Sequence, residues 1–394
     1  MKYYLTPFNE KSIVYYHMLK NRGESIVGFM DGNPYLWDKE YDGIGIFQRC
    51  MIIDATVIIC SDSHKIQEEI KQELLNLGYE EDRIESATKE INISCIVDDI
   101  KIEDIINDFP HNSSKHMRII EKLKKYKKLN KLGIKIEDYS EDQLDGLNRI
   151  ETIDGFVVLK QFELILTNRC TLRCKKCAAG IQYFSKPRDL ELDRIIKDYN
   201  RAIEIIDWVD RIVLIGGEPF LFSGLNLVIE AMMANTLTLE KTSGVTIITN
   251  GTIVPNQELL KTISKNKISV WISNYKNKSP KVGELIEQLR KEKIEFAIMN
   301  VDRWSDVIQL VQRDTIQDKQ ILLDRRKTDC VTRCRTVANG RFYLCSLLKS
   351  MDFMNFTPYD KTNYVDIYGD DAKERIIEML NIDNPLPNNC SFRT

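Results

Sequence analysis

The sequence lacks a long hydrophobic run that could cross a membrane. Its longest apolar stretch, Met51 to Cys60, is interrupted by Asp54 and is too short to span a bilayer. The first residues, Met1 to Glu10, contain no apolar core of the kind that a signal peptide needs. We therefore expect a cytoplasmic protein with no membrane span.

An excess of one charge is also missing. Lys and Arg number 56 against 59 Asp and Glu, which gives a net charge of −3. A chain with this balance has no global field that attracts nucleic acid, so we expect no nucleic-acid partner. The length of 394 residues, with 43% hydrophobic and 29% charged residues, is typical of a folded protein of two or three domains.

Glycine is absent from the place where a dinucleotide-binding domain needs it. Residues 1–106 alternate strands, at Ser25–Met30 and Asp54–Cys60, with helices such as Lys65–Leu77, which predicts a Rossmann-like α/β domain. The first crossover, Tyr4 to Ser12, contains no glycine, so the backbone has no residue that allows close approach to a pyrophosphate. This favours a docking or recognition domain without bound nucleotide over a dinucleotide site.

A lysine-rich segment follows. In residues 107–139, six lysines between Lys122 and Lys131 alternate with Leu123, Tyr126 and Leu129, as in an amphipathic helix. Such runs normally solvate one face of a helix. We expect residues 107–155 to form a helical linker rather than a basic patch for an anionic partner.

The ten cysteines are not expected to form disulfides, because the cytosol keeps thiols reduced. Cys50, Cys60 and Cys95 stand singly among apolar residues and are predicted to be core thiols. The other seven form two groups, which indicates metal binding. These groups are Cys170, Cys174 and Cys177, and then Cys330, Cys334, Cys345 and Cys390.

The α/β alternation restarts after Gly155 with a different spacing. Strands are expected at Glu163–Leu166, Ile212–Ile215, Val245–Ile248, Ser269–Ile272 and Glu295–Ile298, and helices at Leu190–Ile206, Leu225–Ala234, Gln257–Ile263 and Val282–Lys291. This order predicts a parallel sheet or an α/β barrel, in which chemistry lies at the carboxyl ends of the strands.

Residues that can bind metal or take part in chemistry lie at those ends. The first strand leads into Cys170, Cys174 and Cys177, whose spacing brings three thiolates onto one short loop, as in iron–sulfur sites. Zinc is the alternative, although it usually takes four close ligands. The next strand ends in Gly216, Gly217 and Glu218, where glycines allow a ligand near the backbone and the carboxylate can bind an ammonium group.

The third and fourth strands end in small polar side chains. Thr249 and Asn250 follow one strand, and Ser273 and Asn274 follow the other. These groups suit ribose or carboxylate oxygens, although each is equally suited to a turn or a helix cap.

Together these motifs resemble the radical S-adenosylmethionine (SAM) superfamily over roughly residues 156–320. The resemblance implies a partial (β/α)6 barrel, with Cys170, Cys174 and Cys177 holding a [4Fe–4S] cluster whose fourth iron is chelated by SAM. It implies that Gly216, Gly217 and Glu218 hold the ammonium group of SAM. Thr249, Asn250, Ser273 and Asn274 are then the candidates for its carboxylate and ribose. A flavodoxin- or ferredoxin-type electron donor is implied as partner. Lys176 departs from the pattern, since many members carry an aromatic residue there.

The C-terminal segment, residues 321–394, resembles a reduced SPASM or twitch extension. The pattern Cys330-x9-Gly340-x4-Cys345 is similar to the opening of such extensions, which bind auxiliary clusters. Cys334 and Cys390 would complete four ligands to an auxiliary [4Fe–4S] cluster. A zinc knuckle or unligated thiols are the alternatives.

The predicted function is hydrogen abstraction by a 5′-deoxyadenosyl radical from a carbohydrate or sugar nucleotide. The outcome would be epimerisation, oxidation or rearrangement, in surface-polysaccharide biosynthesis. This rests on the resemblance of the domain arrangement to enzymes of such gene clusters. Modification of a ribosomally made peptide is the first alternative. A non-catalytic iron–sulfur or zinc scaffold is the second, but it would need no cofactor-binding rim such as Gly216–Pro219.

Overall fold

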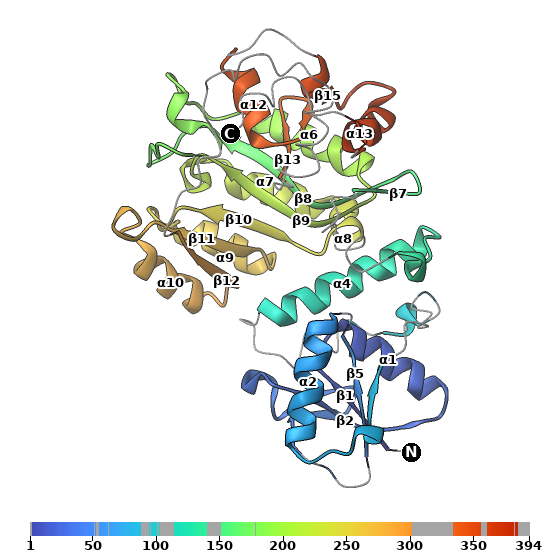
Figure 1. Cartoon of the computed structure of the whole chain (residues 1–394). Helices are drawn as coiled ribbons and strands as arrows, with labels where there is room; N and C mark the ends of the chain where they lie inside the picture. The colour runs from blue at the N-terminus through green and yellow to red at the C-terminus, as the bar shows by residue number, and fades with distance from the viewer. Residues whose placement is uncertain are drawn as a thin grey trace, which may run out of the picture. The chain divides into compact units, whose positions relative to one another are not determined.

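The computed structural model describes most of the chain, in two compact units (Figure 1). The described residues are 2–50, 52, 55–61, 63–87, 94, 96–100, 102, 114–139, 151–177, 179–301, 334–355, 361–381 and 383–384. Met1–Leu144 belong to the first unit and Asp145–Thr394 to the second. In the described part of the chain, no helix is both long and apolar enough to span a membrane.

The first unit contains a six-stranded sheet. Its strands, from edge to edge, are β3 (Lys39–Tyr41), β4 (Ile44–Gln48), β2 (Ser25–Asp31), β1 (Lys2–Thr6), β5 (Thr56–Ile59) and β6 (Ile84–Ser86). All pairs are parallel except β3 with β4. The longer helices are α1 (Glu10–Asn21), α2 (His64–Asn76) and α4 (Ser114–Lys131).

The predicted elements of this unit are present. The four residues of β5 are all buried, as expected for a central parallel strand. Helix α2 begins at the capping residue Ser63 and ends before Gly78, whose φ of +100° suits glycine. Helix α4 buries Leu123, Tyr126 and Leu129, so the apolar positions of the lysine-rich segment form one packed face.

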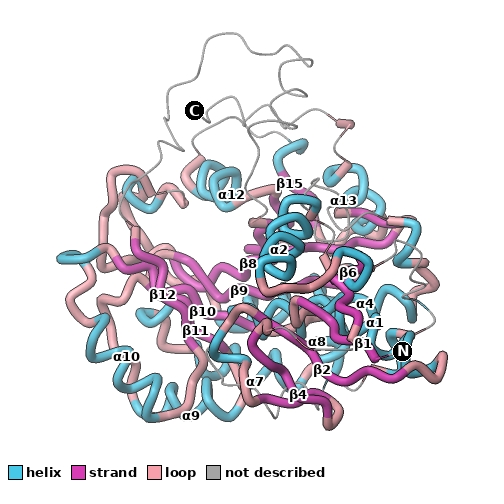
Figure 2. The backbone as a smooth tube through the Cα atoms, turned by 60° about the horizontal axis from the view of Figure 1, so that its bottom comes forward, coloured by secondary structure: helices cyan, strands magenta, loops and turns pink. Residues whose placement is uncertain are grey.

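The second unit contains a nine-stranded sheet, and its strands β8 to β12 are labelled in Figure 2. Its order is β12 (Phe296–Asn300), β11 (Ser269–Asn274), β10 (Val245–Thr249), β9 (Trp208–Gly216), β8 (Phe156–Thr167), β13 (Arg335–Ala338), β14 (Arg341–Tyr343) and β15 (Tyr364–Asp366), with β7 (Thr152–Ile153) paired to β8. The pairs from β12 to β13 are parallel, and those of β7 with β8, β13 with β14 and β14 with β15 are antiparallel.

Helices connect the parallel strands as the sequence predicts. They are α6 (Leu192–Ile205), α7 (Leu225–Ala234), α8 (Thr236–Lys241), α9 (Gln257–Lys265) and α10 (Val282–Lys291), followed by α12 (Ser346–Phe353) and α13 (Ala372–Leu380). The bounds of α7 and α10 are those predicted, whereas the short α8 was not predicted. A continuous apolar core joins the strands to the helices, and Phe162 of β8 stacks on Tyr199 of α6.

Five strands, β8 to β12, lie side by side in chain order. Beyond β8 the sheet continues with β13. The first of these five strands, β8, is therefore an internal strand of the sheet. A sixth strand of the repeat is not found among the described residues, and residues 302–333 lie outside them. The (β/α)6 barrel therefore stays a prediction, as does the division into segments 1–106, 107–155, 156–320 and 321–394.

Candidate functional site

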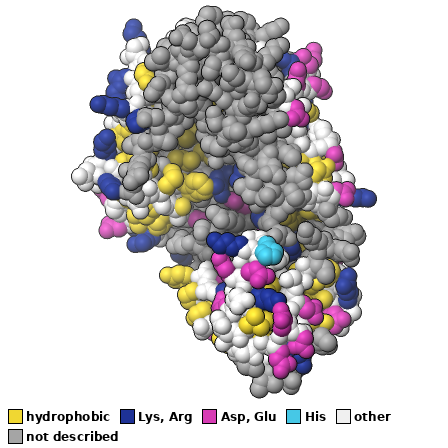
Figure 3. All heavy atoms as spheres, in the orientation of Figure 1, with side chains coloured by type: hydrophobic (Ala, Val, Ile, Leu, Met, Phe, Trp, Pro, Cys, Tyr) yellow, Lys and Arg dark blue, Asp and Glu magenta, His cyan; other side chains and the backbone are white. Residues whose placement is uncertain are grey.

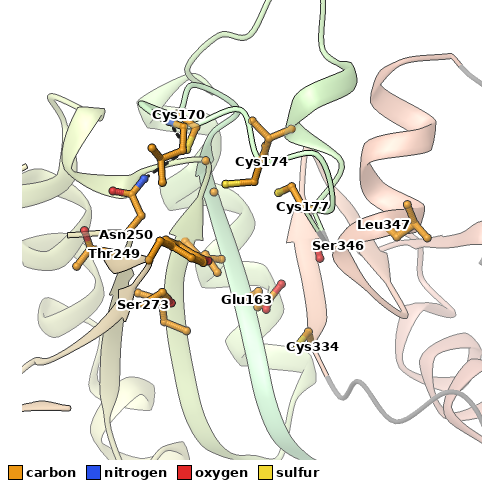
Figure 4. Close-up of a pocket in the computed structure, with 18 of the residues that line it drawn as sticks. Glu163, Cys170, Cys174, Cys177, Thr249, Asn250, Ser273, Cys334, Ser346 and Leu347 are labelled. Carbon is orange, nitrogen blue, oxygen red and sulfur yellow. Dashed lines mark hydrogen bonds between the residues drawn. The ribbon is translucent and has the colours of Figure 1, made fainter. Parts of the chain in front are cut away.

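The three-cysteine loop begins where β8 ends. Hydrogen bonds from Thr167 Oγ1 to Asp189 Oδ1 at 2.6 Å and from Asn168 N to Arg188 O at 2.9 Å close its base. Cys170, Cys174 and Cys177 are all partly exposed. In Figure 4 they lie together at one end of a cavity. The sequence therefore brings three thiols to one place without burying any of them completely.

The two glycines at the end of β9 pack directly against this loop. A Cβ on Gly216 would lie 2.2 Å from the carbonyl oxygen of Thr167. One on Gly217 would lie 2.0 Å from the carbonyl oxygen of Arg169. The amide of Gly217 donates to Thr167 O at 2.8 Å. No side chain fits at either position, so close approach of the two backbones requires glycine.

Glu218 is completely buried beside the cavity. Its carboxylate accepts hydrogen bonds from Thr249 Oγ1 and Asn250 N, both at 2.8 Å, and from Phe220 N at 3.1 Å. Burial raises the pKa of Glu218 to about 7. The carboxylate is not part of the cavity wall, which is formed here by Gly216 and Gly217. Glu218 thus joins the ends of β9 and β10.

The next strand ends complete one side of the cavity. Thr249, Asn250 and Ser273 line it, and Asn250 Nδ2 lies 3.5 Å from Cys170 Sγ. Asn274 is not part of the wall, and its side chain donates to Asn300 Oδ1 at 2.9 Å. Gly251 follows with a φ of +70°, which favours glycine.

The cavity has a volume of about 270 Å³ and also contains two C-terminal cysteines. Cys334 and Cys345 line it, with Cys334 drawn at the end away from the three-cysteine loop in Figure 4. Gly340 of the predicted cysteine pattern lies in the tight turn between β13 and β14, where Asn339 and Gly340 both have positive φ. Cys330 and Cys390 lie outside the described residues.

Glu163 is a wall residue that the sequence analysis did not single out. It lies in β8, is buried, and accepts hydrogen bonds from Thr336 Oγ1 at 3.2 Å and Gln161 Nε2 at 3.3 Å. Burial raises its pKa. A carboxylate within the apolar run Phe162–Leu166 was the signal that could have identified it. Ser346, Leu347 and Ile181 also line the cavity, and their residue types carry no such signal.

Three cysteine thiols on one loop are the kind of ligand that an iron–sulfur cluster requires. Within the described ranges, no three His, Cys, Asp or Glu side chains are arranged to hold one metal ion. Burial raises the pKa of the Cys170 thiol to about 11. Three thiols around an open cavity, with glycine backbone on the facing side, leave room for a larger group.

Comparison with known proteins identifies the family. Residues 164–316 match the model of the radical SAM superfamily. A search of curated proteins gave no match. The matched segment contains the three-cysteine loop and the four strand ends described above. Fold and site thus define an α/β domain with three cysteine thiols on the loop after its first strand. The chain is an enzyme of the radical SAM superfamily. Membership implies a [4Fe–4S] cluster and SAM as cofactors.

Several solved structures are similar to part of the chain. The structure of anSMEcpe with bound AdoMet is 17% identical, with a TM-score of 0.40, and the match covers 60% of this chain and 84% of that one. BtrN in complex with AdoMet and 2-DOIA is 16% identical, with a TM-score of 0.36 over 58% and 89% of the two chains. Streptococcus suis SuiB bound to S-adenosylmethionine is 14% identical, with a TM-score of 0.26 over 48% and 54%. Similarity of this degree identifies no substrate.

Proposed function

We propose that this enzyme generates a 5′-deoxyadenosyl radical and uses it to remove a hydrogen atom from a substrate bound in the cavity. The observation that carries the proposal is that one cavity is lined by three kinds of group. They are the thiols of Cys170, Cys174 and Cys177, the two glycines of β9, and the polar residues at the ends of β10 and β11. When bound, the cluster and SAM supply the radical chemistry. The protein supplies binding, orientation and exclusion of water.

The strand ends hold SAM in this proposal. Backbone groups of Gly216 and Gly217 lie open to the cavity and would receive its ammonium group, while Glu218 keeps this strand end in position. Thr249, Asn250 and Ser273 offer hydroxyl and amide groups for its carboxylate and ribose. Asn274 is the weakest of the candidates, because its amide is already engaged with Asn300.

For the substrate we propose a carbohydrate or sugar nucleotide. Glu163 and Ser346 give the wall groups that can accept hydrogen bonds from hydroxyls. In the first unit, the strand order β4-β2-β1-β5-β6 is that of a Rossmann-like parallel sheet. This supports the carbohydrate alternative over peptide modification, for which a winged-helix recognition module would be expected.

Cys334 and Cys345 would hold an auxiliary [4Fe–4S] cluster, together with Cys330 and Cys390. Their presence in the wall of the same cavity supports this assignment, since a cluster there would lie close to the substrate. Burial raises the pKa of the Cys334 thiol, and a bound metal ion would favour its thiolate form.

An acidic one-electron carrier of the flavodoxin or ferredoxin type would reduce the first cluster. The three-cysteine loop carries exposed basic side chains at Arg169, Arg173, Lys175 and Lys176. Lys and Arg side chains also gather along the left edge of the second unit in Figure 3. Such a surface attracts a negatively charged partner in a protein whose net charge is −3.

The test is anaerobic reconstitution followed by incubation with SAM and a strong reductant. We expect about eight irons per chain, about four for each cluster, and slow release of 5′-deoxyadenosine and methionine without substrate. The triple variant Cys170→Ala, Cys174→Ala, Cys177→Ala should keep about four irons on the same count and release neither product. Cys50→Ala is the control and should match the unmodified protein. The prediction that Cys50 is a core thiol was wrong, because this thiol is exposed, whereas Cys60 is buried. Zinc without iron, or equal release from the triple variant, would contradict the proposal.

A further inference from the structure

Lys349 is a completely buried lysine between the two cysteine groups. Its side chain is 0% exposed, which is rare for lysine. It lies on α12, the helix that begins directly after Cys345. This helix packs on the three-cysteine loop, where Ser350 Oγ donates to the carbonyl oxygen of Ala179. The ammonium group is therefore enclosed between the segment that carries Cys345 and the loop that carries Cys177.

The partners of this ammonium group are neutral. Its Nζ donates to Asn168 Oδ1 at 3.3 Å and lies 5.7 Å from the ring centre of Phe184 and 5.5 Å from that of Phe353. No ion pair of Lys349 occurs among the described residues. An amide oxygen and two ring faces compensate only part of the several kcal/mol that a buried charge costs.

The charged and ionisable groups that act on Lys349 are few. They are Glu163, Cys177 and Cys345. The Glu163 carboxylate, which also accepts hydrogen bonds from Thr336 and Gln161, is the first of these charges but forms no ion pair with Lys349. The other two groups are cysteines, one from each group assigned to a cluster. A negative group at the cysteines would supply a second counter-charge beside that of Glu163.

We propose that Lys349 is the internal counter-charge of the iron–sulfur site, a positioning residue that balances the negative thiolate-bound cluster on the three-cysteine loop. The inference rests on the proposed function, in which Cys177 is a cluster ligand. Reduction adds one electron to that cluster. A fixed positive charge nearby stabilises the reduced form more than the oxidised form, because net charge and hydrogen bonding around a cluster set its potential. Lys349 thus makes the cluster easier to reduce.

The test is an anaerobic redox titration of the reconstituted full-length protein, followed by electron paramagnetic resonance. Lys349→Met removes the charge and keeps the length of the side chain, so the midpoint potential should shift to a more negative value. Lys373→Met is the matched control. Lys373 also lies over an aromatic ring, that of Phe156 at 5.6 Å, but it has its own carboxylate partner in Asp207. Its substitution should leave the potential unchanged.

Asn168→Asp keeps the proposal testable if Lys349→Met fails to fold. The new carboxylate would pair with the ammonium group and cancel its charge, so the potential should again become more negative. An unchanged potential in a variant that retains its iron would overturn the proposal. Failure of the proposed function would look different, because the unmodified protein would then hold no iron at all.

Discussion

At the scale of single residues, Glu218 shows how one buried side chain can hold two strand ends in register. Its carboxylate receives one hydrogen bond from the hydroxyl of Thr249 and one from the amide of Asn250, so the end of β10 is fixed against the end of β9. Gly216 and Gly217 precede it and face the cavity. A substitution of Glu218 should therefore displace the backbone of Gly216 and Gly217, which we propose binds SAM.

We predict that Glu218→Gln weakens SAM binding by about ten- to a hundredfold. The NH2 group of glutamine would replace one carboxylate oxygen and could not accept the hydrogen bonds made to it. Loss of a hydrogen bond to a charged group costs roughly 1.5–3 kcal/mol, which corresponds to this change in affinity. Iron content should stay unchanged, because Glu218 is not a cluster ligand in the proposal. Equilibrium binding of SAM to the reconstituted protein measures the effect. Glu204→Gln, at an exposed residue of α6, is the control. Loss of iron, or normal SAM affinity, would contradict the prediction.

The pH dependence of stability gives a second prediction for Glu218. Its pKa is raised from 4.5 to about 7, so between these values the folded protein binds more protons than the unfolded chain. The free energy of unfolding should therefore fall as pH rises through this window, by roughly 3 kcal/mol from this group. Denaturation of metal-free protein at pH 5 and pH 7.5 measures the fall. Glu218→Gln should lack this part of it, so an identical pH dependence in both proteins would be inconsistent with the shift.

At the scale of elements, Asp198 fastens the β13–β14 hairpin to helix α6. Its carboxylate accepts hydrogen bonds from Gly340 N at 2.7 Å and Tyr368 Oη at 2.9 Å, and Arg194 Nε lies 2.8 Å away. The hairpin brings Cys334 and Cys345 to the cavity. Asp198 is thus a structural link between the strand repeat and the segment of the second cysteine group.

Asp198→Asn should destabilise the second unit. The amide keeps one acceptor but places an NH2 group against a buried donor, which costs about 1–3 kcal/mol of unfolding free energy. Chemical denaturation of the full-length protein measures the change. Asp193→Asn, at an exposed position on the same helix, should have almost no effect. Equal stability of the two variants would show that the hairpin does not depend on this carboxylate.

Most elements of the second unit could be predicted because local patterns determine them. Strands β8 to β12 and helices α7 and α10 follow from apolar periodicity, and the carboxyl ends of parallel strands necessarily share an edge. The pairing of β13 with β8 could not be predicted, because it joins residues such as Arg335 and Phe162 that are far apart in the chain. Lys349 and Glu163 were not predicted as site residues for a related reason. Each is a single charged residue in an apolar segment and belongs to no spaced motif of the kind that metal ligands form.

At the scale of the whole molecule, the two units have parallel sheets with different chemistry at the strand ends. The second unit presents thiols and an open cavity there. In the first unit, the corresponding positions are filled by the protein itself. Asn9 Oδ1 accepts from Ser12 N at 2.8 Å, and Ser12 Oγ accepts from Asn9 N at 3.0 Å. The amide directly before Asn9, that of Phe8, donates to Asp31 Oδ2 at 2.9 Å.

These contacts leave little for a dinucleotide to bind. A pyrophosphate is normally held by free amides at the start of the first helix, next to glycines that permit close approach. Here the side chain of Asn9 also donates to Cys60 O at 2.8 Å and crosses from β1 to β5, the switch point of this sheet. A pyrophosphate would have to break this capping box and displace Phe8, which is almost completely buried.

We therefore predict that the full-length protein does not bind NAD or NADP with useful affinity. Isothermal titration calorimetry with each dinucleotide should give no heat of binding above that of dilution. The double variant Asn9→Gly, Ser12→Gly removes the capping box and frees two amides, and it should still bind neither dinucleotide, because Asp31 and Phe8 continue to occupy the site. Micromolar binding to the unmodified protein would overturn the prediction. Binding to the double variant alone would show that the capping box by itself closes the switch point.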